Sequence, residues 1–344
     1  MSANDYLTER LTRHQIFVQR FGGSEVNKML PFLRSILNEI RASLSGDLTP
    51  FGRNRLVGIE SSIARIVTEG MEGIEASLTS DLIEFAEYEG EFMARLLDSS
   101  VSVEALSVTP EQIRSAITTK PMQLIKGKQV QSLTMQSAFR QFSGTVSRDV
   151  RRVVQMGIVE GKTTQQMIVD ITRLISNRTS NQAEALVRTV TNHAATVARN
   201  ITAEENADIL DGERFVATLD NRVTTTCAGF DGKKFDVGQG PHPALHWNCR
   251  STRAPVLRQE FAALQMEGER PSKGDDGKNV VSGKVTYGGF LKRQSDEFQN
   301  KVLGPERAKL FRSGKVSIEK FTNDRGIPYS LDELRQDDAS LTLQ

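Results

Sequence analysis

The sequence contains few of the residues on which catalytic and disulfide-rich proteins depend. Its 344 residues include two cysteines, four histidines and one tryptophan, and only 6% are aromatic. Two cysteines exclude a disulfide-rich secreted scaffold and fit a chain made in a reducing compartment. Four histidines leave little material for imidazole-based catalysis. No Ser-His-Asp order, nucleophile elbow or dinucleotide fingerprint is present, so we expect no enzymatic activity and no bound cofactor.

A surplus of one charge and long apolar runs are also missing. Forty-four basic residues face 43 acidic ones, which gives a net charge of +1. A dedicated nucleic-acid binder usually has a basic surplus, so this balance argues against that class while allowing a local basic patch. No apolar run reaches the roughly 18 residues of a membrane span, and no signal peptide follows Met1. We expect a soluble protein that is synthesised in the cytoplasm and does not bind membranes.

Helical periodicity dominates the first 207 residues. Apolar residues recur at helical spacing, for example over 7–18 and again over 30–44. Thr109 and Thr163 each precede a glutamine by three positions, which is the capping-box signature of a helix start. Ser180 is the predicted cap of the last long helix.

The pattern changes near Gly212, where a strand is predicted over 213–219. Asp231-Gly232 predicts a two-residue hairpin turn, because Asp-Gly tolerates the positive φ angles of a type I′ turn. The polar segment 267–285 predicts a loop, and helical spacing resumes over 290–311 with a break at Gly304-Pro305.

These patterns predict an α+β, predominantly α protein. A long helical arm, residues 1–140, would dock on other subunits. A small α+β domain with a β-hairpin, residues 141–344, would follow it.

Two motifs resemble known sites but depart from them. The segment Gly157–Thr163 has three residues between its glycines where a phosphate-binding loop needs four, and it follows a predicted helix instead of a strand. A turn between two helices is the preferred interpretation. His242 and His246 are four residues apart, but Pro241 and Pro243 predict an irregular segment there, and the glutamate of a metalloprotease motif is missing.

Cys227, His246 and Cys249 are the candidate metal ligands. Thiolates and an imidazole suit zinc, but a closed structural zinc site needs four ligands. His242 or Asp231 would have to supply the fourth. Two buried thiols and a late disulfide are the alternatives that the residues leave open.

The arginines 148, 151 and 152 lie along one predicted helix. A solvated face is the preferred interpretation, and DNA contact there would be electrostatic and non-specific. Trp247, the single tryptophan, is expected in the core or at an interface.

The segment from Asp220 to Val256 resembles the head-morphogenesis domain shared by the Mu F and SPP1 minor head proteins of bacteriophages. The shared features are an Asp-x-Arg start, a cysteine, a Phe-x-Gly turn, a Pro-x-x-His segment and a closing Cys-Arg. In this sequence they correspond to Asp220 with Arg222, Cys227, Phe230 to Gly232 (which includes Asp231), Pro243 to His246, and Cys249 with Arg250. The resemblance extends in order over residues 145–335, whereas residues 1–140 resemble no known family.

The resemblance implies a structural motif in which Cys227 and Cys249 share a small knuckle. Family members often carry two further cysteines, whose positions are occupied here by Phe230 and Ser251. We therefore favour packed free thiols with His246 as a hydrogen-bonding neighbour. We also expect Arg222 to form a charge-assisted hydrogen bond beside the strand end.

The resemblance further implies a low-copy component of the virion, located in the phage head interior or at the portal vertex. Its implied partners are the portal protein, together with scaffold and major capsid proteins, and its implied roles are procapsid assembly and DNA packaging or ejection. Two alternatives remain open: a toxin or nuclease effector, and a DNA-binding accessory protein carried in the virion. An effector module should bring its own catalytic cluster, yet residues 1–140 contain one histidine, His14.

Overall fold

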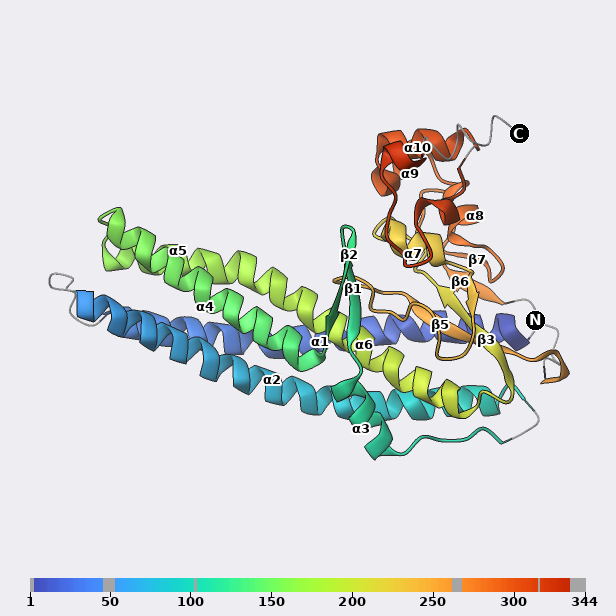
Figure 1. Cartoon of the computed structure of the whole chain (residues 1–344), viewed down its shortest axis with the longest axis horizontal. Helices are drawn as coiled ribbons and strands as arrows, with labels where there is room; N and C mark the ends of the chain where they lie inside the picture. The colour runs from blue at the N-terminus through green and yellow to red at the C-terminus, as the bar shows by residue number, and fades with distance from the viewer. Residues whose placement is uncertain (1–2, 46–52, 102–103, 262–267, 315, 335–344) are drawn as a thin grey trace.

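The protein is a bundle of long helices with a small α+β region at one end (Figure 1). This structure is a computed structural model, and it describes residues 3–45, 53–101, 104–261, 268–314 and 316–334. The predominantly α, α+β class that the sequence predicts is confirmed. In the described part of the chain, no helix combines the length and the hydropathy needed to cross a membrane.

Long antiparallel helices form the bundle. Its elements are α1 (Ala3–Ser45), α2 (Arg53–Asp98), α4 (Met135–Val159), α5 (Thr164–Arg173), the π-helix η1 (Leu174–Thr179) and α6 (Ser180–Glu205). α1 and α2 run in opposite directions along the bundle, and α6 packs against both (Figure 1). One continuous apolar core joins these helices, and it includes the fully buried Ile40, Ile63, Val150 and Val190.

α1 and α2 are each one uninterrupted helix of more than 40 residues. α1 contains both of the apolar stripes, 7–18 and 30–44. Gly22 of α1 lies against α6, where a Cβ atom added to it would lie 3.6 Å from the Thr191 side chain. A side chain at Gly70 of α2 would collide with Ile36 of α1. These glycines therefore permit close helix packing instead of ending helices.

The predicted capping boxes are confirmed, and one unpredicted hairpin appears between them. Thr109 caps α3 (Pro110–Thr119) and Thr163 caps α5, each accepting a hydrogen bond from the backbone N–H three residues on. Ser180 is not a cap, since its hydroxyl donates to the carbonyl of Ile175 and the chain continues helically from η1 into α6. Between α3 and α4, strands β1 (Met122–Lys126) and β2 (Gln129–Leu133) form an antiparallel hairpin.

The C-terminal region holds two further small sheets and several short helices. β3 (Leu210–Val216) lies between β4 (Lys234–Phe235) and β5 (Thr252–Leu257), antiparallel to both, and β6 (Glu269–Pro271) pairs with β7 (Val280–Ser282). The helices are α7 (Thr225–Phe230), α8 (Tyr287–Leu291), α9 (Asp296–Leu303) and α10 (Pro305–Arg312), with 3-10 turns η2 (Gln259–Phe261) and η3 (Ile318–Phe321). The predicted break before Pro305 is confirmed, with Gly304 at φ 78°.

Two local predictions in this region are wrong. The Asp231-Gly232 turn does not join two strands, because Thr224 caps a helical turn and α7 occupies the place of the first strand. Asp231 and Gly232 instead connect α7 to β4. The predicted loop 267–285 contains the short hairpin β6–β7, whose strands are too brief to show an apolar alternation.

The predicted division at residue 140 does not coincide with a break in the structure, since it falls inside α4. The core of the bundle includes residues on both sides of it. Leu7 and Leu11 of α1 and Leu97 of α2 also pack with Leu210 and Leu257 of the β3–β5 sheet. The N-terminal helices therefore support the C-terminal region directly.

Candidate functional site: the cysteine knuckle

The three candidate metal ligands meet in one buried cluster, which we call the knuckle. Cys227 lies on α7, His246 in the irregular segment before β5, and Cys249 three residues further on. The two Sγ atoms are 3.9 Å apart, and the Cys227 Sγ lies 3.2 Å from the His246 Nε2. Both thiols are buried, with 1% and 0% exposure. The predicted proximity of the two cysteines is thus confirmed.

The irregular segment is held in place by the bundle and by the unpredicted hairpin. The backbone N–H of Asn248 donates to the Thr189 hydroxyl on α6 at 2.9 Å, and the N–H of Ile125 on β1 donates to the carbonyl of Leu245 at 2.7 Å. The N–H of Cys249 donates to the carbonyl of His246 at 3.1 Å, which closes a tight turn. This turn brings the imidazole and the second thiol to the same side of the chain.

The knuckle distributes its protons unevenly. A hydrogen bond to Cys249, together with burial, raises the pKa of the Cys227 thiol well above its usual value. The same hydrogen bond, received by Cys249, outweighs burial and, with the charge of His246, lowers the pKa of Cys249 far below that of a free thiol. Burial acts to lower the pKa of His246, but the Cys249 thiolate outweighs it and raises that pKa. These shifts favour a proton on Cys227 and on His246 over a proton on Cys249.

The knuckle supplies three of the four donors of a closed zinc site. The ligand atoms of Cys227, His246 and Cys249 all lie within 4.8 Å of one another, and their separations resemble the edges of a zinc tetrahedron with bonds of about 2.0–2.3 Å. Neither predicted fourth ligand reaches them. His242 contacts Asn200 at 2.7 Å and Arg253 at 2.8 Å, and Asp231 pairs with Arg270 at 2.9 Å. Among the residues that the structure describes, no further histidine, cysteine or carboxylate joins these three, so a closed zinc site would need a fourth ligand from elsewhere.

The main side-chain partner of Asp220 is Arg250, and the predicted Arg222 contributes a longer ion pair and a backbone hydrogen bond. Arg250 donates through both terminal nitrogens, Nη2 lying 2.9 Å from Oδ1, while the side chain of Arg222 is 73% exposed and stays 3.6 Å away. Burial acts to raise the pKa of Asp220, but the hydrogen bonds and charge of Arg250 outweigh it and lower that pKa. Only the backbone N–H of Arg222 bonds to Asp220, at 2.9 Å.

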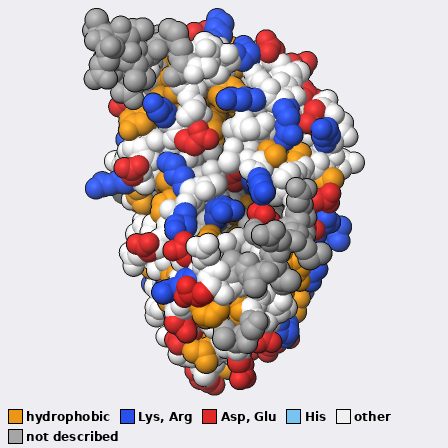
Figure 2. Space-filling model, turned by 90° about the vertical axis from the view of Figure 1, so that its right-hand side faces the viewer, with side chains coloured by type: hydrophobic (Ala, Val, Ile, Leu, Met, Phe, Trp, Pro, Cys, Tyr) orange, Lys and Arg blue, Asp and Glu red, His pale blue; other side chains and the backbone are white. Residues whose placement is uncertain are grey.

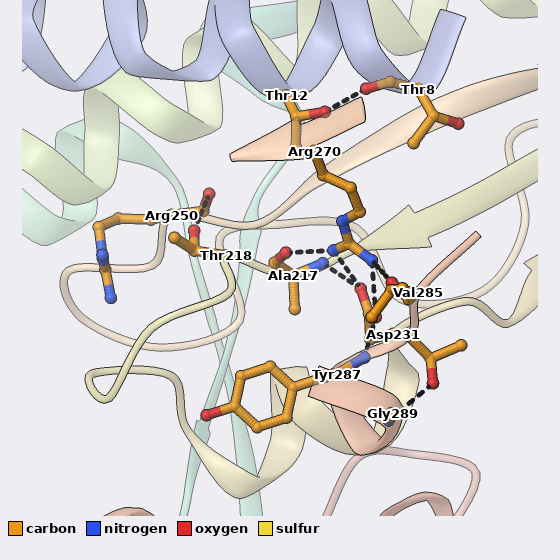
Figure 3. Close-up of polar contacts among 11 residues, drawn as sticks. Thr8, Thr12, Ala217, Thr218, Asp231, Arg250, Arg270, Val285, Tyr287 and Gly289 are labelled. Atoms are coloured by element: carbon orange, nitrogen blue, oxygen red, sulfur yellow. Dashed lines mark hydrogen bonds and ion pairs between the residues drawn. The ribbon is translucent and has the colours of Figure 1, made fainter. Parts of the chain in front are cut away.

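Asp231 is the hub that joins the knuckle to the surrounding strands and helix (Figure 3). Its carboxylate accepts the N–H of Ala217 at 2.7 Å and that of Tyr287 at 2.6 Å. Arg270 on β6 adds a two-pronged ion pair at 2.9 and 3.1 Å. The Arg270 guanidinium also donates to the carbonyls of Ala217 and Val285. This single carboxylate thereby fixes the end of β3, β6 and the start of α8 relative to α7.

Sequence analysis missed the role of Arg270, which lies in the predicted loop 39 positions after Asp231. Gly232 was correctly singled out, since it adopts φ +85° and an added Cβ would lie 3.1 Å from the Thr286 side chain. Tyr287, whose hydroxyl donates to the backbone carbonyl of Asp220 at 2.8 Å, completes the link between the two acidic residues. Burial raises the pKa of this tyrosine well above its usual range, so the phenol stays protonated.

Neither thiol of the knuckle is open to a substrate. Thiolate nucleophiles need access to a substrate, and both sulfur atoms are buried beneath Phe215, Phe230 and Leu245. His246 alone reaches the wall of a neighbouring cavity of about 720 Å³ between α1, α6 and the β3–β5 sheet. The acidic residues of the motif are fully engaged with arginine and backbone partners.

One comparison with known proteins finds a similarity over part of the chain. Residues 148–254 match the family model described as Phage Mu protein F like protein. No curated protein and no solved structure gives a significant match. The Mu F-like segment runs from α4 through β5 and contains Asp220, Cys227, His246 and Cys249.

The resemblance seen in the sequence is therefore confirmed over the Mu F-like segment. Its continuation over 287–335 lies outside the matched residues and stays a prediction. The hub connects the two parts, since Asp231 lies inside the Mu F-like segment while Arg270 and Tyr287 lie beyond it.

Proposed function

We propose that the chain is a structural minor head protein of a bacteriophage, acting in procapsid assembly at the portal and in DNA packaging or ejection. The observation that carries this proposal is the match of residues 148–254 to the Mu F-like family. The proposed partners are the portal protein, the scaffold and the major capsid protein. The proposed location is the head interior or the portal vertex.

The geometry of the motif supports a structural role. Its carboxylates, Asp220 and Asp231, are buried and bind arginines and backbone amides of the same chain. Catalytic carboxylates must instead face a substrate. The knuckle cysteines are covered by apolar side chains. We therefore propose that the motif stabilises a docking domain and performs no reaction.

The N-terminal helices support the same proposal over the effector alternative. His14, the single histidine of residues 1–140, contacts the Glu89 carboxylate at 2.7 Å and stacks on Phe92 with ring centroids 3.6 Å apart. Glu89 is itself buried against Arg199 of α6. The imidazole thus belongs to a hydrogen-bonded network inside the bundle, where it links α1 to α2 and is not presented to a substrate.

The test is assembly with the proteins encoded beside it in the phage genome. The chain would be produced together with the portal, scaffold and major capsid proteins, and the lysate separated on a sucrose gradient. We expect the chain to sediment with procapsids and to return to the top of the gradient when the portal gene is omitted. A chain that remains at the top while portal-containing procapsids form would contradict the proposal.

A further inference from the structure

A groove separate from the knuckle lies between α4, α6 and the β1–β2 hairpin. Its volume is about 700 Å³. Apolar side chains from α4 and α6 form part of its wall, including the buried Phe142 and Leu186. Cationic side chains line it from β1 and α4, namely Lys126, Arg140 and Arg148.

The charge of this groove has one sign. None of its lining residues is an aspartate or a glutamate. In the ranges that the structure describes, Lys126, Arg140 and Arg148 form no ion pair, although the charge of Arg140 acts on Glu75. By contrast, Arg152 on the same helix pairs with Asp149 at 3.8 Å. On the end face of the molecule shown in Figure 2, cationic side chains also lie among anionic ones, unlike those of the groove.

Trp247 gives the groove a second kind of recognition surface. The single tryptophan of the chain is 41% exposed, and it lines both this groove and the cavity beside the knuckle. Of the two expected positions, the core is therefore wrong, while an interface stays a prediction. Amide side chains of Gln131, Gln141 and Gln182 line the same groove. An exposed indole can stack on a planar ring, and amides can hydrogen-bond to its edge.

We propose that this groove binds an unpaired nucleic-acid strand. The three cations would contact successive phosphates, and Trp247 would stack on a base. An acidic peptide would satisfy the cations as well, but it would leave the indole without a flat partner. The proposal goes beyond the proposed head function and does not depend on it, because binding is measured on the isolated full-length chain.

The experiment titrates the chain with a single-stranded dT oligonucleotide of 20 nucleotides. Quenching of intrinsic tryptophan fluorescence reports on Trp247 alone, since the chain has no other tryptophan. The anisotropy of the labelled oligonucleotide gives the affinity independently. With three phosphate contacts, we expect the affinity to fall with salt at a logarithmic slope of about −2, because each contact to a single strand contributes about −0.7.

Two variants and one matched control separate the groove from bulk charge. Arg140→Glu with Arg148→Glu should reduce the affinity by about tenfold or more and flatten the salt dependence. The control, Arg10→Glu with Arg34→Glu, changes the net charge by the same amount at exposed positions of α1 that do not line the groove. It should reduce the affinity for the oligonucleotide much less. Trp247→Ala should weaken binding about fivefold or more, whereas Trp247→Phe should largely restore it.

Each remaining outcome overturns the proposal. Equal losses in the two double variants would show that only net charge matters. Tighter binding of a 20-base-pair duplex without fluorescence quenching would identify a surface that reads a helical backbone. Equal affinity for poly-glutamate of matched charge would identify an acidic peptide as the occupant. Circular dichroism on every variant ensures that a loss of binding is not a loss of folding.

Discussion

The replacement of Asp231 by alanine tests the hub most severely. The side chain of Asp231 is 1% exposed and that of Arg270 is 4% exposed, so the guanidinium would lose its counter-charge inside the protein. The N–H groups of Ala217 and Tyr287 would lose their acceptors at the same time. Breaking a buried pair by removing one partner costs about 3–5 kcal/mol. The orphaned N–H groups are part of the same loss, so we expect a destabilisation of about 4 kcal/mol.

Urea unfolding followed by circular dichroism measures this change. Asp211→Ala is the control, since Asp211 on β3 forms an exposed ion pair with Lys234 on β4 at 2.7 Å, and its loss should cost less than about 1 kcal/mol. The double change Asp231→Ala with Arg270→Met should recover much of the stability, because no buried charge is left without a partner. If the free energy of unfolding of the Asp231→Ala protein lay within about 1 kcal/mol of the wild-type value, the proposed role of Asp231 would be wrong.

Three further predictions concern the Asp220–Arg250 ion pair and the knuckle. Arg250→Ala should lower the free energy of unfolding by about 2–3 kcal/mol, because it removes charge-assisted hydrogen bonds to buried Asp220. Arg222→Ala should change it by less than about 0.5 kcal/mol in the same urea unfolding experiment. A larger loss for Arg222→Ala than for Arg250→Ala would support the sequence-based prediction instead. Because the pKa of His246 is raised on folding, protonated His246 stabilises the folded protein. This stabilisation is complete at pH values below 6.5, the ordinary pKa of histidine, and is lost as the pH rises through the pKa of His246 in the folded state. Cys249→Ala should lower the pKa of His246 below 6.5 by removing the thiolate that opposes burial, and an unchanged NMR titration would contradict the ion pair. Metal analysis and thiol counting should find well under one zinc per chain and two thiols that react only after unfolding, while stoichiometric zinc would exclude the free-thiol state.

Local signals in the sequence predicted the elements that local physics determines. The capping boxes at Thr109 and Thr163 satisfy backbone donors within one turn, so the helices start where the residues indicate. Gly304-Pro305 separates α9 from α10 for a similar reason. The Asp231-Gly232 turn misled because the preceding residues form a capped helical turn, and the role of Asp231 depends on Arg270.

Long-range pairing could not be predicted in the same way. Asp220 has one arginine two positions away and another 30 positions away. The more distant one, Arg250, binds the carboxylate, because the chain before β5 lies close to the end of β3. The β1–β2 hairpin was missed because its strands are only five residues long and β2 has no buried residue, although Met122 and Leu124 of β1 are buried. The proximity of Cys227 and Cys249 was predictable from the family resemblance, whereas the proton distribution between them depends on burial that only the fold provides.

The central claim, that this chain is a structural component of a phage head, is tested most directly by quantifying it in purified virions. Targeted mass spectrometry would measure its copy number relative to the portal protein, in particles washed at high salt and treated with nuclease. The account predicts a reproducible, low copy number per portal in every preparation. Particles that are complete and infectious but contain none of the chain, with all of it left in the soluble lysate, would contradict the account.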